Sequence, residues 1–286
     1  ELVEELRKDL KASVVLQMDE TVVQVLHEKN RSAQSKSYMW VARGYHEKRP
    51  ILFFHYHPSR AKEIVQTFLT GYRGYVQTDG YAGYSEVGFS PGVTHVGCLA
   101  HVRRKFFEAE KQGNTDASSF LSQIADLYHT EHTLRQRYEE GSITTQAFLA
   151  ARREAQQPKL AAMKAWLLSR QGTSPPSLAF GKAVHYALGQ WDRIEKYLEH
   201  ELLTPDNNLV ENAIRPFVIG RKNWLFSNTP LGAHASAGIY SVIETAKANG
   251  HEPYRFLCYL FDALPKAKTS EQKRALLPYM LDPNSY

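Results

Sequence analysis

The hydrophobic pattern of this sequence changes near residue 100, and that change constrains the fold more than any other feature. The first hundred residues contain stretches rich in β-branched and aromatic side chains, some alternating with polar residues, which predicts strands. One amphipathic stretch among them, with Ser59 as its candidate N-cap, predicts a helix. We expect the five strands within residues 13–26, 37–45, 49–57, 74–80 and 93–100.

From about residue 100 to residue 200 the pattern is almost wholly helical. Leu121, Ile124 and Leu127 recur at helical spacing. Two more amphipathic stretches follow, and Pro175 and Pro176 suit the first turn of the last one. Three strands in a meander, a helix and two further strands follow the order of the ribonuclease H fold. We therefore expect an α/β protein with a ribonuclease H-like mixed sheet, a large all-helical insertion and a helical C-terminal tail.

The last eighty or so residues predict further helices. Asn208, Glu211 and Arg215 are spaced to share one helix face, and Pro216 is expected to end or kink that helix. The chain would then divide into the first part of the core, the helical insertion, the last core helix with a basic loop, and a C-terminal helical segment. These parts are expected at residues 1–113, 114–203, 204–229 and 230–286.

Composition restricts the class of protein. The chain has 286 residues and a net charge of +5, which is compatible with a polyanionic partner. Its two cysteines, Cys98 and Cys258, form no Cys-x-x-Cys pair, which argues against a zinc ribbon and suits a reducing cytoplasm. No apolar run reaches the roughly 18 residues of a membrane span. Because the chain begins with Glu1 rather than Met, we expect a fragment that lacks upstream domains.

Two aspartates occupy strand positions that disfavour this residue. Asp19 lies inside the first expected strand, and Asp79 lies at the end of the fourth. If those strands are parallel neighbours, the two carboxylates converge, and a cation must then offset their repulsion. Mg²⁺, with Mn²⁺ as an alternative, is the cation that oxygen ligands suit, and a pair of such ions catalyses phosphoryl transfer. Glu211, on a polar helix face, is the candidate third ligand.

Each carboxylate also has a structural alternative. An aspartate before glycine is a common turn residue, which would explain Asp79. A strand aspartate can be an exposed edge residue, in which case the neighbouring Glu20 could be the ligand. Glu211 could pair with Arg215 one turn away. Glu244, in a later helical stretch, is an alternative third carboxylate.

Two basic clusters would suit a nucleic-acid backbone running past such a site. One begins the helical region after the fifth strand, and the other follows the Glu211 helix. A solvated helix face is the alternative for both. Trp224, next to the second cluster, could stack on a base, but packing in the core is favoured. The candidate nucleic-acid-binding residues are His101, Arg104, Lys105, Asn208, Arg215, Arg221, Lys222 and Asn223.

Five segments in this order resemble the transposases of the insertion-sequence-sixty-six family, and the likeness covers nearly the whole chain. Five co-linear motifs make the resemblance specific, unlike any one of them alone. The segments are "DET" at 19–21, "TDGYAGY" at 78–84, "GCLAHVRRKFFE" at 97–108, "DNNLVENAIRPFVIGRKNWLFS" at 206–227 and "YSVIETAKANG" at 240–250.

The resemblance implies a DDE transposase with a ribonuclease H-like core and a helical insertion before the final glutamate. By that match Asp19, Asp79 and Glu211 would be the metal-binding triad. A separate hypothesis is that Asn208 and Asn212 orient Glu211 from the same helix. The implied reaction is Mg²⁺-dependent cleavage of transposon ends and strand transfer into target DNA. Double-stranded DNA would be the substrate, a homo-oligomer would assemble on it, and companion transposition proteins could be required. The expected location is the bacterial cytoplasm, at the nucleoid.

The sequence departs from the family pattern in two respects. It contains neither the upstream leucine-zipper or helix-turn-helix region nor the cysteine-rich zinc-binding segment that family members usually carry. Val22 also stands where a proline usually follows the first motif. Two alternatives stay open: a ribonuclease H-like nuclease or resolvase that only hydrolyses, and a truncated, non-catalytic DNA-binding remnant.

Overall fold

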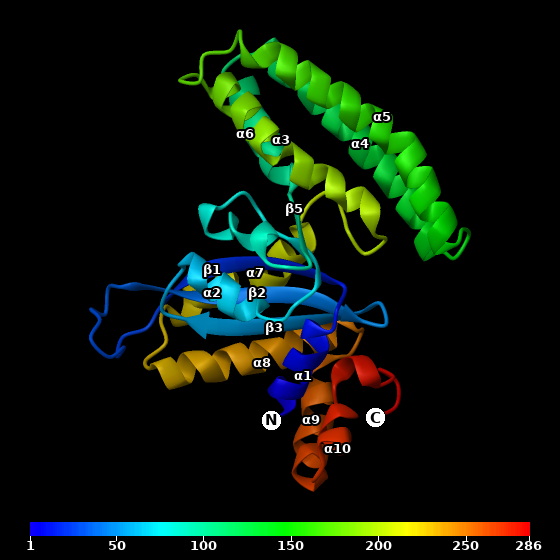
Figure 1. The fold of residues 1–286 in the computed structure, drawn as a ribbon. Coiled ribbons are helices and arrows are strands. Elements are labelled where there is room, and N and C mark those ends of the chain that lie inside the picture. The colour runs from blue at the N-terminus through cyan, green and yellow to red at the C-terminus, as the bar shows by residue number, and fades with distance from the viewer. The chain divides into compact units, whose positions relative to one another are not determined.

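The structure, a computed structural model, covers residues 1–286. The chain forms two compact units, each assembled from segments that are distant in sequence (Figure 1). The sheet unit contains residues 1–76, 82–93 and 208–286, and the helical unit contains residues 77–81 and 94–207. The chain therefore leaves the sheet unit twice, at residues 77–81 and again at residues 94–207, and returns to it for good at residue 208.

Five strands form one mixed sheet. They are β1 (Val15–Gln24), β2 (Lys36–His46), β3 (Arg49–His57), β4 (Gly74–Gln77) and β5 (Val93–Val96). Their order across the sheet is β3-β2-β1-β4-β5. β1 pairs antiparallel with β2, and β2 with β3, so that Asp19 lies opposite Val41 and Val41 opposite Phe54. The expected α/β architecture, with a three-stranded meander followed by a helix and two more strands, is confirmed.

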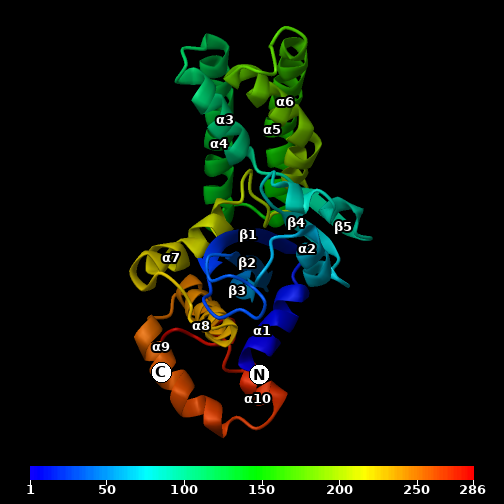
Figure 2. The same cartoon turned by 90° about the vertical axis from the view of Figure 1, so that its left-hand side faces the viewer.

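Four helices of the sheet unit cover its strands. They are α1 (Leu2–Lys11), α2 (Lys62–Leu69), α7 (Asn208–Trp224) and α8 (Pro230–Ala248). On one face, Val23 and Val41 of the sheet meet Val210 and Phe217 of α7 in a buried apolar cluster, which α8 completes. α1 and α2 lie on the other side of the sheet (Figure 2). Because successive residues of a strand point to opposite faces, each strand side chain faces either α7 and α8 or α1 and α2.

The structure corrects the start of α2. Its N-cap is Ala61, and Ser59 does not cap the helix. The Ser59 hydroxyl instead accepts the backbone N–H of Ala61 at 3.0 Å, a bond across two residues that closes the turn before the helix.

α8 protects the edge of the sheet at β3. The hydroxyls of Ser241 and Thr245 accept the backbone N–H groups of Phe54 at 2.8 Å and Leu52 at 3.0 Å. The Thr245 hydroxyl also donates to the carbonyl of Leu52 at 3.0 Å. These bonds occupy backbone groups that an unpaired edge strand would otherwise offer to another chain.

α7 continues past Pro216, so this proline does not end the helix, which was one of the two outcomes expected for it. The helix ends instead after Trp224, where Leu225 adopts a positive φ of 64° and its N–H bonds to the carbonyl of Arg221 at 2.8 Å. A left-handed residue directly after the last turn is a usual way to terminate a helix. The basic segment expected as a loop is therefore the last turn of α7.

Long helices dominate the helical unit. They are α3 (Leu99–Glu110), α4 (Thr115–Glu139), α5 (Thr145–Gln171) and α6 (Ala179–Ile194). Asn114 and Thr144 cap α4 and α5 by accepting a backbone N–H. Phe106 and Phe120 pack with ring centroids 4.3 Å apart. The expected helical block is confirmed, but Pro175 and Pro176 precede α6 and do not form its first turn. The carbonyl of Pro175 accepts the N–H of Leu178 at 3.1 Å, so these prolines belong to a turn.

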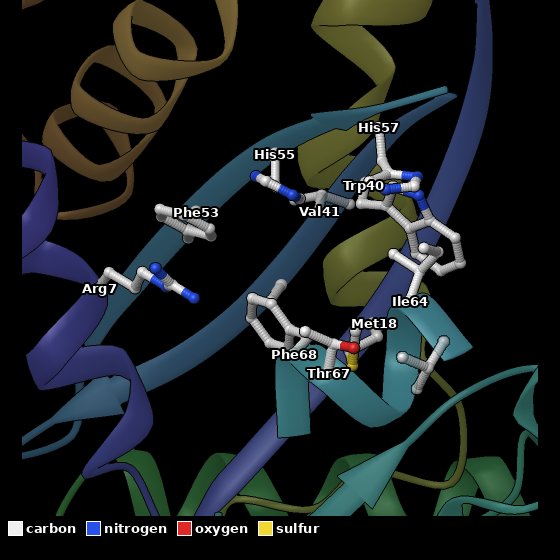
Figure 3. Close-up of a pocket in the computed structure, with 12 residues that line it drawn as sticks. Arg7, Met18, Trp40, Val41, Phe53, His55, His57, Ile64, Thr67 and Phe68 are labelled. Atoms are coloured by element: carbon white, nitrogen blue, oxygen red, sulfur yellow. The ribbon is translucent and has the colours of Figure 1, made fainter. Parts of the chain in front are cut away.

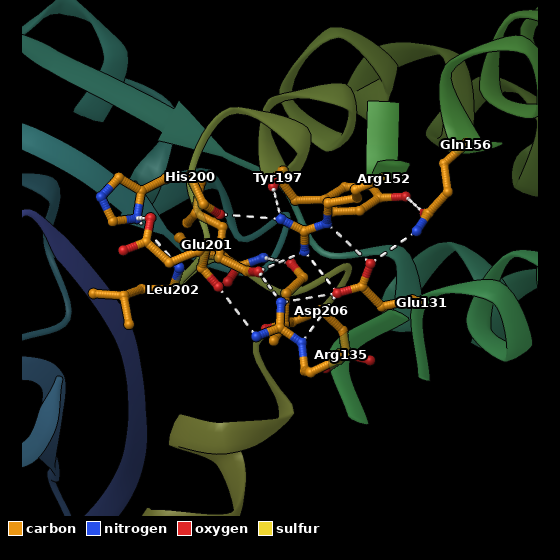
Figure 4. Close-up of polar contacts among 12 residues, drawn as sticks. Glu131, Arg135, Arg152, Gln156, Tyr197, His200, Glu201, Leu202 and Asp206 are labelled. Atoms are coloured by element: carbon orange, nitrogen blue, oxygen red, sulfur yellow. Dashed lines mark hydrogen bonds and ion pairs between the residues drawn. The ribbon is translucent and has the colours of Figure 1, made fainter. Parts of the chain in front are cut away.

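A buried polar network joins α4, α5 and the segment that follows α6 (Figure 4). Glu131, only 4% exposed, accepts hydrogen bonds from Arg152 at 2.7 and 2.9 Å, from Arg135 at 2.8 Å and from Gln156 at 2.8 Å. Arg152 also donates to the carbonyl of Leu203 at 2.7 Å. Burial alone would raise the pKa of Glu131, but the two guanidinium groups and Gln156 outweigh it and hold that pKa below its ordinary value.

The C-terminal residues form the expected helical tail, with α9 (Pro253–Ala263) and α10 (Ser270–Arg274). Glu252 caps α9 by accepting the N–H groups of Tyr254 and Arg255. None of the helices in this chain combines the length and the apolar character that crossing a membrane requires.

Candidate active site

Asp19 lies in β1 on the face of the sheet that α7 covers. Asp19 and Val23 are four positions apart on β1, so their side chains lie on the same face, and the cross-strand partner of Asp19 is Val41. Both valines belong to the apolar cluster beneath α7. Asp19 itself is half-buried, and its carboxylate accepts the backbone N–H of Glu20 at 2.8 Å. The sequence placed this aspartate inside a strand, and the structure adds which face it occupies.

Glu20, the alternative ligand, points to the opposite face and is held there. Its side chain is 2% exposed. The guanidinium of Arg60 donates to it at 2.5 Å, and the hydroxyl of Tyr84 also donates to it. Tyr84 is buried and packs edge-to-face against Trp40. This saturated arrangement favours Asp19 over Glu20 as the candidate ligand.

Glu211 lies near the start of α7, next to the face by which that helix packs on the sheet. Val210 and Ile214 are buried in the apolar cluster, whereas Glu211 is half-buried. Asn208 and Arg215, at helical spacing on either side of it, are exposed. The sheet unit therefore contains two of the three candidate carboxylates, one on β1 and one on the helix that covers β1.

Some side chains of the last turn of α7 hold the helix on the sheet, and others are exposed. Arg221 donates to the hydroxyl of Thr21 at 3.0 Å and to the carbonyl of Val22, and so fastens α7 to β1. Lys222 and Asn223 are exposed and remain candidates for a phosphate backbone. The core interpretation of Trp224 is confirmed, because its ring packs against the apolar cluster and lies 5.2 Å from the ring of Phe217.

Glu244, the alternative third carboxylate, lies on α8. Its side chain is 8% exposed, and both of its oxygens accept bonds from Lys247 at 2.9 Å. α8 packs against β3, which β2 separates from β1. Glu244 is therefore neutralised by a neighbour on its own helix. That helix packs against β3 and not against β1, the strand that carries Asp19.

Asp79 belongs to the helical unit, in the short segment that follows β4. One of its carboxylate oxygens accepts the N–H of Tyr81 at 3.0 Å, which is the turn interaction expected of an aspartate before glycine. Its other oxygen lies 3.9 Å from Nε2 of His101 on α3. Arg104, one turn further along α3, lies with a guanidinium nitrogen 3.5 Å from the same histidine nitrogen. The side chain of Asp79 is 24% exposed, so it remains accessible.

Tyr186, on α6, holds the turn that carries Asp79. A Cβ atom added to Gly80 would lie 2.2 Å from the Tyr186 hydroxyl, so only glycine allows this close approach. Burial, followed by the charge of Asp79, raises the pKa of Tyr186 to about 12. The ammonium of Lys105 lies 4.7 Å from the centre of the tyrosine ring.

The sequence did not identify Tyr186 as part of the site. The residue lies in an ordinary amphipathic helical pattern more than a hundred positions after Asp79, and such patterns indicate only packing. Within the helical unit the structure thus gathers Asp79, His101, Arg104, Lys105 and Tyr186. The other candidate residues, Asp19, Asn208, Glu211, Arg215, Arg221, Lys222 and Asn223, belong to the sheet unit.

Comparison with known proteins identifies a family. Residues 1–235 match the family described as "Transposase IS66 family", and residues 241–279 match the "IS66 C-terminal element". The protein y4jD of Sinorhizobium fredii (strain NBRC 101917 / NGR234) is 27% identical over 238 residues, covering 80% of this chain and 45% of y4jD. The protein y4qI of the same strain is 27% identical over 248 residues, covering 82% of this chain and 44% of y4qI.

Both relatives are described as uncharacterized, and this chain spans less than half the length of each. No solved structure matches the chain. Because the two family matches together cover nearly the whole sequence, the chain belongs to the IS66 family of transposases.

Proposed function

We propose that this chain is a DDE transposase, which uses Asp19, Asp79 and Glu211 to bind two Mg²⁺ ions, cleaves transposon ends and joins them to target DNA. The observation that carries the proposal is the position of Asp19 on the sheet face covered by α7, the helix that also bears Glu211. Membership of the transposase family supports the reaction class. The strand order β3-β2-β1-β4-β5 supports a ribonuclease H-like core.

The three residues fit the proposed metal. They supply only carboxylate oxygens, which are the ligands that Mg²⁺ prefers, and Mn²⁺ accepts the same set. Glu20 and Glu244 are already neutralised by Arg60 and Lys247, so they would hold a cation less well. Bound ions would stabilise the attacking and leaving oxygens of an in-line phosphoryl transfer.

The chain's own residues would contribute position and charge. Exposed cations on α3 and α7 would hold the phosphate backbones, and Asn208 and Asn212 would orient Glu211 from the same helix. Water would attack the phosphodiester at the transposon end and release a 3′-hydroxyl. That hydroxyl would then attack a target phosphodiester and displace the 3′ oxygen there, so no covalent protein intermediate is required. Arg104, Lys105, Arg215 and Lys222 are the cations assigned to this task.

The wider setting follows from the same proposal. Two transposon ends must be processed together, so we expect at least a dimer on double-stranded DNA, with companion transposition proteins where the element encodes them. The reaction would take place in the bacterial cytoplasm, at the nucleoid. A fusion to a fluorescent protein that failed to co-localise with DNA would contradict this setting.

A strand-transfer assay tests the function. The purified chain is incubated with a pre-cut transposon end, a target plasmid and Mg²⁺, and joined products are quantified. Asp79→Asn should abolish joining, because it removes a ligand charge. The matched control is Asp116→Asn, which changes the same residue type at a surface ion pair with Arg170 and should join normally.

Each remaining result has a definite meaning. Plasmid nicking without joined product would identify a nuclease or resolvase that only hydrolyses. DNA binding without any Mg²⁺-dependent nicking would identify a non-catalytic remnant. Normal joining by Asp79→Asn would refute the assignment of this residue.

A further inference from the structure

A pocket of about 150 Å³ opens on the sheet face opposite α7. Its floor is formed by buried side chains of the strands: Met18, Trp40, Ala42 and Phe53 are each at most 5% exposed. α1 and α2 border it on the sides, so the pocket lies wholly within the sheet unit. Figure 3 shows the side chain of Arg7 reaching toward the hollow from α1.

The size and lining of the pocket suit one aromatic ring. A cavity of about 150 Å³ with an apolar lining holds a molecule the size of benzene. Trp40, Phe53 and Phe68 supply aromatic surfaces, and the rings of Phe53 and Phe68 lie 6.1 Å apart between centroids. A ligand ring could therefore meet these side chains edge-to-face or offset-stacked.

The polar groups of the pocket select a negative charge. No carboxylate lines it, and Arg7 is its permanent cation. The salt-bridge partner of Arg7 is Glu4 at 3.8 Å, with both side chains well exposed, and such a surface pair is weak. His55 also lines the pocket, and its ring centroid lies 6.4 Å from that of His57 and 6.1 Å from that of His234. Burial, together with the nearby histidines His234 and His57 and with Arg7, lowers the pKa of His55 to about 4, so the ring is neutral near pH 7 and can donate or accept.

The edge of the sheet argues for a small molecule over an extended peptide. A peptide that adds a strand needs free backbone groups along β3. Ser241 and Thr245 of α8 already occupy those of Phe54 and Leu52. The occupant must therefore fit the pocket itself.

We propose that this pocket binds a small aromatic carboxylate, with its ring on the floor formed by Trp40 and Phe53 and its carboxylate between Arg7 and His55. The ring would displace water from buried apolar surface, and the carboxylate would replace Glu4 as the partner of Arg7. The site lies on the opposite face from Asp19, so ligand binding here is separate from the proposed chemistry on DNA.

Ligand-observed and protein-observed NMR on the full chain tests the proposal, with phenylacetate as the probe. Phenylacetate should shift the ring resonances of Trp40, His55 and Phe68, whereas benzylamine, which has the same ring and the opposite charge, should bind at least tenfold more weakly. Arg7→Gln should weaken phenylacetate binding at least tenfold. Lys8→Gln removes the same charge from the next position of α1, outside the pocket, and should leave binding unchanged.

A second variant tests whether binding requires the volume of the pocket as well as the charge of Arg7. Thr67→Trp, at the exposed rim on α2, should fill the opening and abolish binding without changing the buried floor. Thymidine monophosphate tests for a nucleotide and should bind more weakly than phenylacetate.

Four outcomes would overturn the proposal. The first is equal binding of phenylacetate and benzylamine, and the second is wild-type affinity in Arg7→Gln or in Thr67→Trp. The third is tighter binding of thymidine monophosphate than of phenylacetate, and the fourth is no shift at the pocket rings.

Discussion

The helical unit contains two carboxylates in opposite circumstances. Glu131 is buried and accepts hydrogen bonds from Arg135, Arg152 and Gln156. Asp79 is partly exposed, accepts a backbone N–H in its own turn and has His101 at 3.9 Å. A carboxylate saturated by guanidinium groups stabilises a fold but offers no lone pair to a ligand, whereas one bordered by weaker partners can still bind a cation. The difference separates structural acids from candidate catalytic ones.

The largest expected effect tests the catalytic side of this comparison. Asp19→Asn and Glu211→Gln should each lower the strand-transfer rate more than roughly 100-fold, since even changes outside the ligand set of a metal site cost up to about that much. Their thermal midpoints should stay close to that of the unchanged chain. Glu131→Gln should do the opposite, with lower stability and a normal rate per folded molecule. A normal strand-transfer rate in Glu211→Gln would show that the third metal ligand is another residue.

Arg152→Met tests the structural side. The change leaves Glu131 buried with less compensation, and it should cost about 3–5 kcal/mol of unfolding free energy, measured by urea denaturation. Arg170→Met breaks the exposed ion pair with Asp116 and should cost at most about 1 kcal/mol. Equal losses in the two variants would show that burial does not govern the strength of these pairs.

Acid should weaken the network around Glu131. The pKa of this carboxyl is lower in the folded protein than its ordinary value of 4.5, so the stability it contributes is present above pH 4.5. That contribution is lost as the pH falls through the folded pKa, because protonation then releases the guanidinium partners. As the pH is lowered below 4.5, the denaturation midpoint of the unchanged chain should therefore decrease more steeply than that of Glu131→Gln. Parallel profiles would contradict the assignment.

Gly80→Ala should disturb Asp79 without unfolding the helical unit. The added methyl group meets the hydroxyl of Tyr186, so the turn must shift, and a displacement of that kind should lower the strand-transfer rate roughly 10- to 100-fold. Gly189→Ala, on the same helix as Tyr186 and facing open space, is the control and should be neutral. Adding Tyr186→Ala to Gly80→Ala should restore part of the rate if the clash is the cause.

The smallest expected effect concerns the exposed cations. Lys222→Gln should weaken DNA binding similarly for all sequences and reduce the slope of log affinity against log salt by about 1. Lys164→Gln removes a lysine that pairs with Asp192 on the helical unit and should not change the slope. An unchanged slope in Lys222→Gln would remove this residue from the DNA-binding surface.

Local pattern was sufficient for most elements of this fold. Alternation and β-branched residues indicated the five strands, and helical spacing indicated α4 and α5, because these signals depend on neighbours along the chain. Ser59 and Pro175 were misplaced for a different reason, which is the geometry of the turns that contain them. Whether a polar or proline residue caps, precedes or enters a helix depends on the turn geometry around it. The boundaries of the helical insertion stay predictions.

Residue types and short spacings were enough to indicate the family, the candidate carboxylates and the alternation of strands and helices. Packing between distant elements was needed to show that Glu20 is bound by Arg60 and Tyr84 and that Tyr186 approaches Gly80. The contact between Gly80 and Tyr186 joins positions more than a hundred residues apart. Such contacts depend on which face of a strand or helix meets another element, and that is settled by packing.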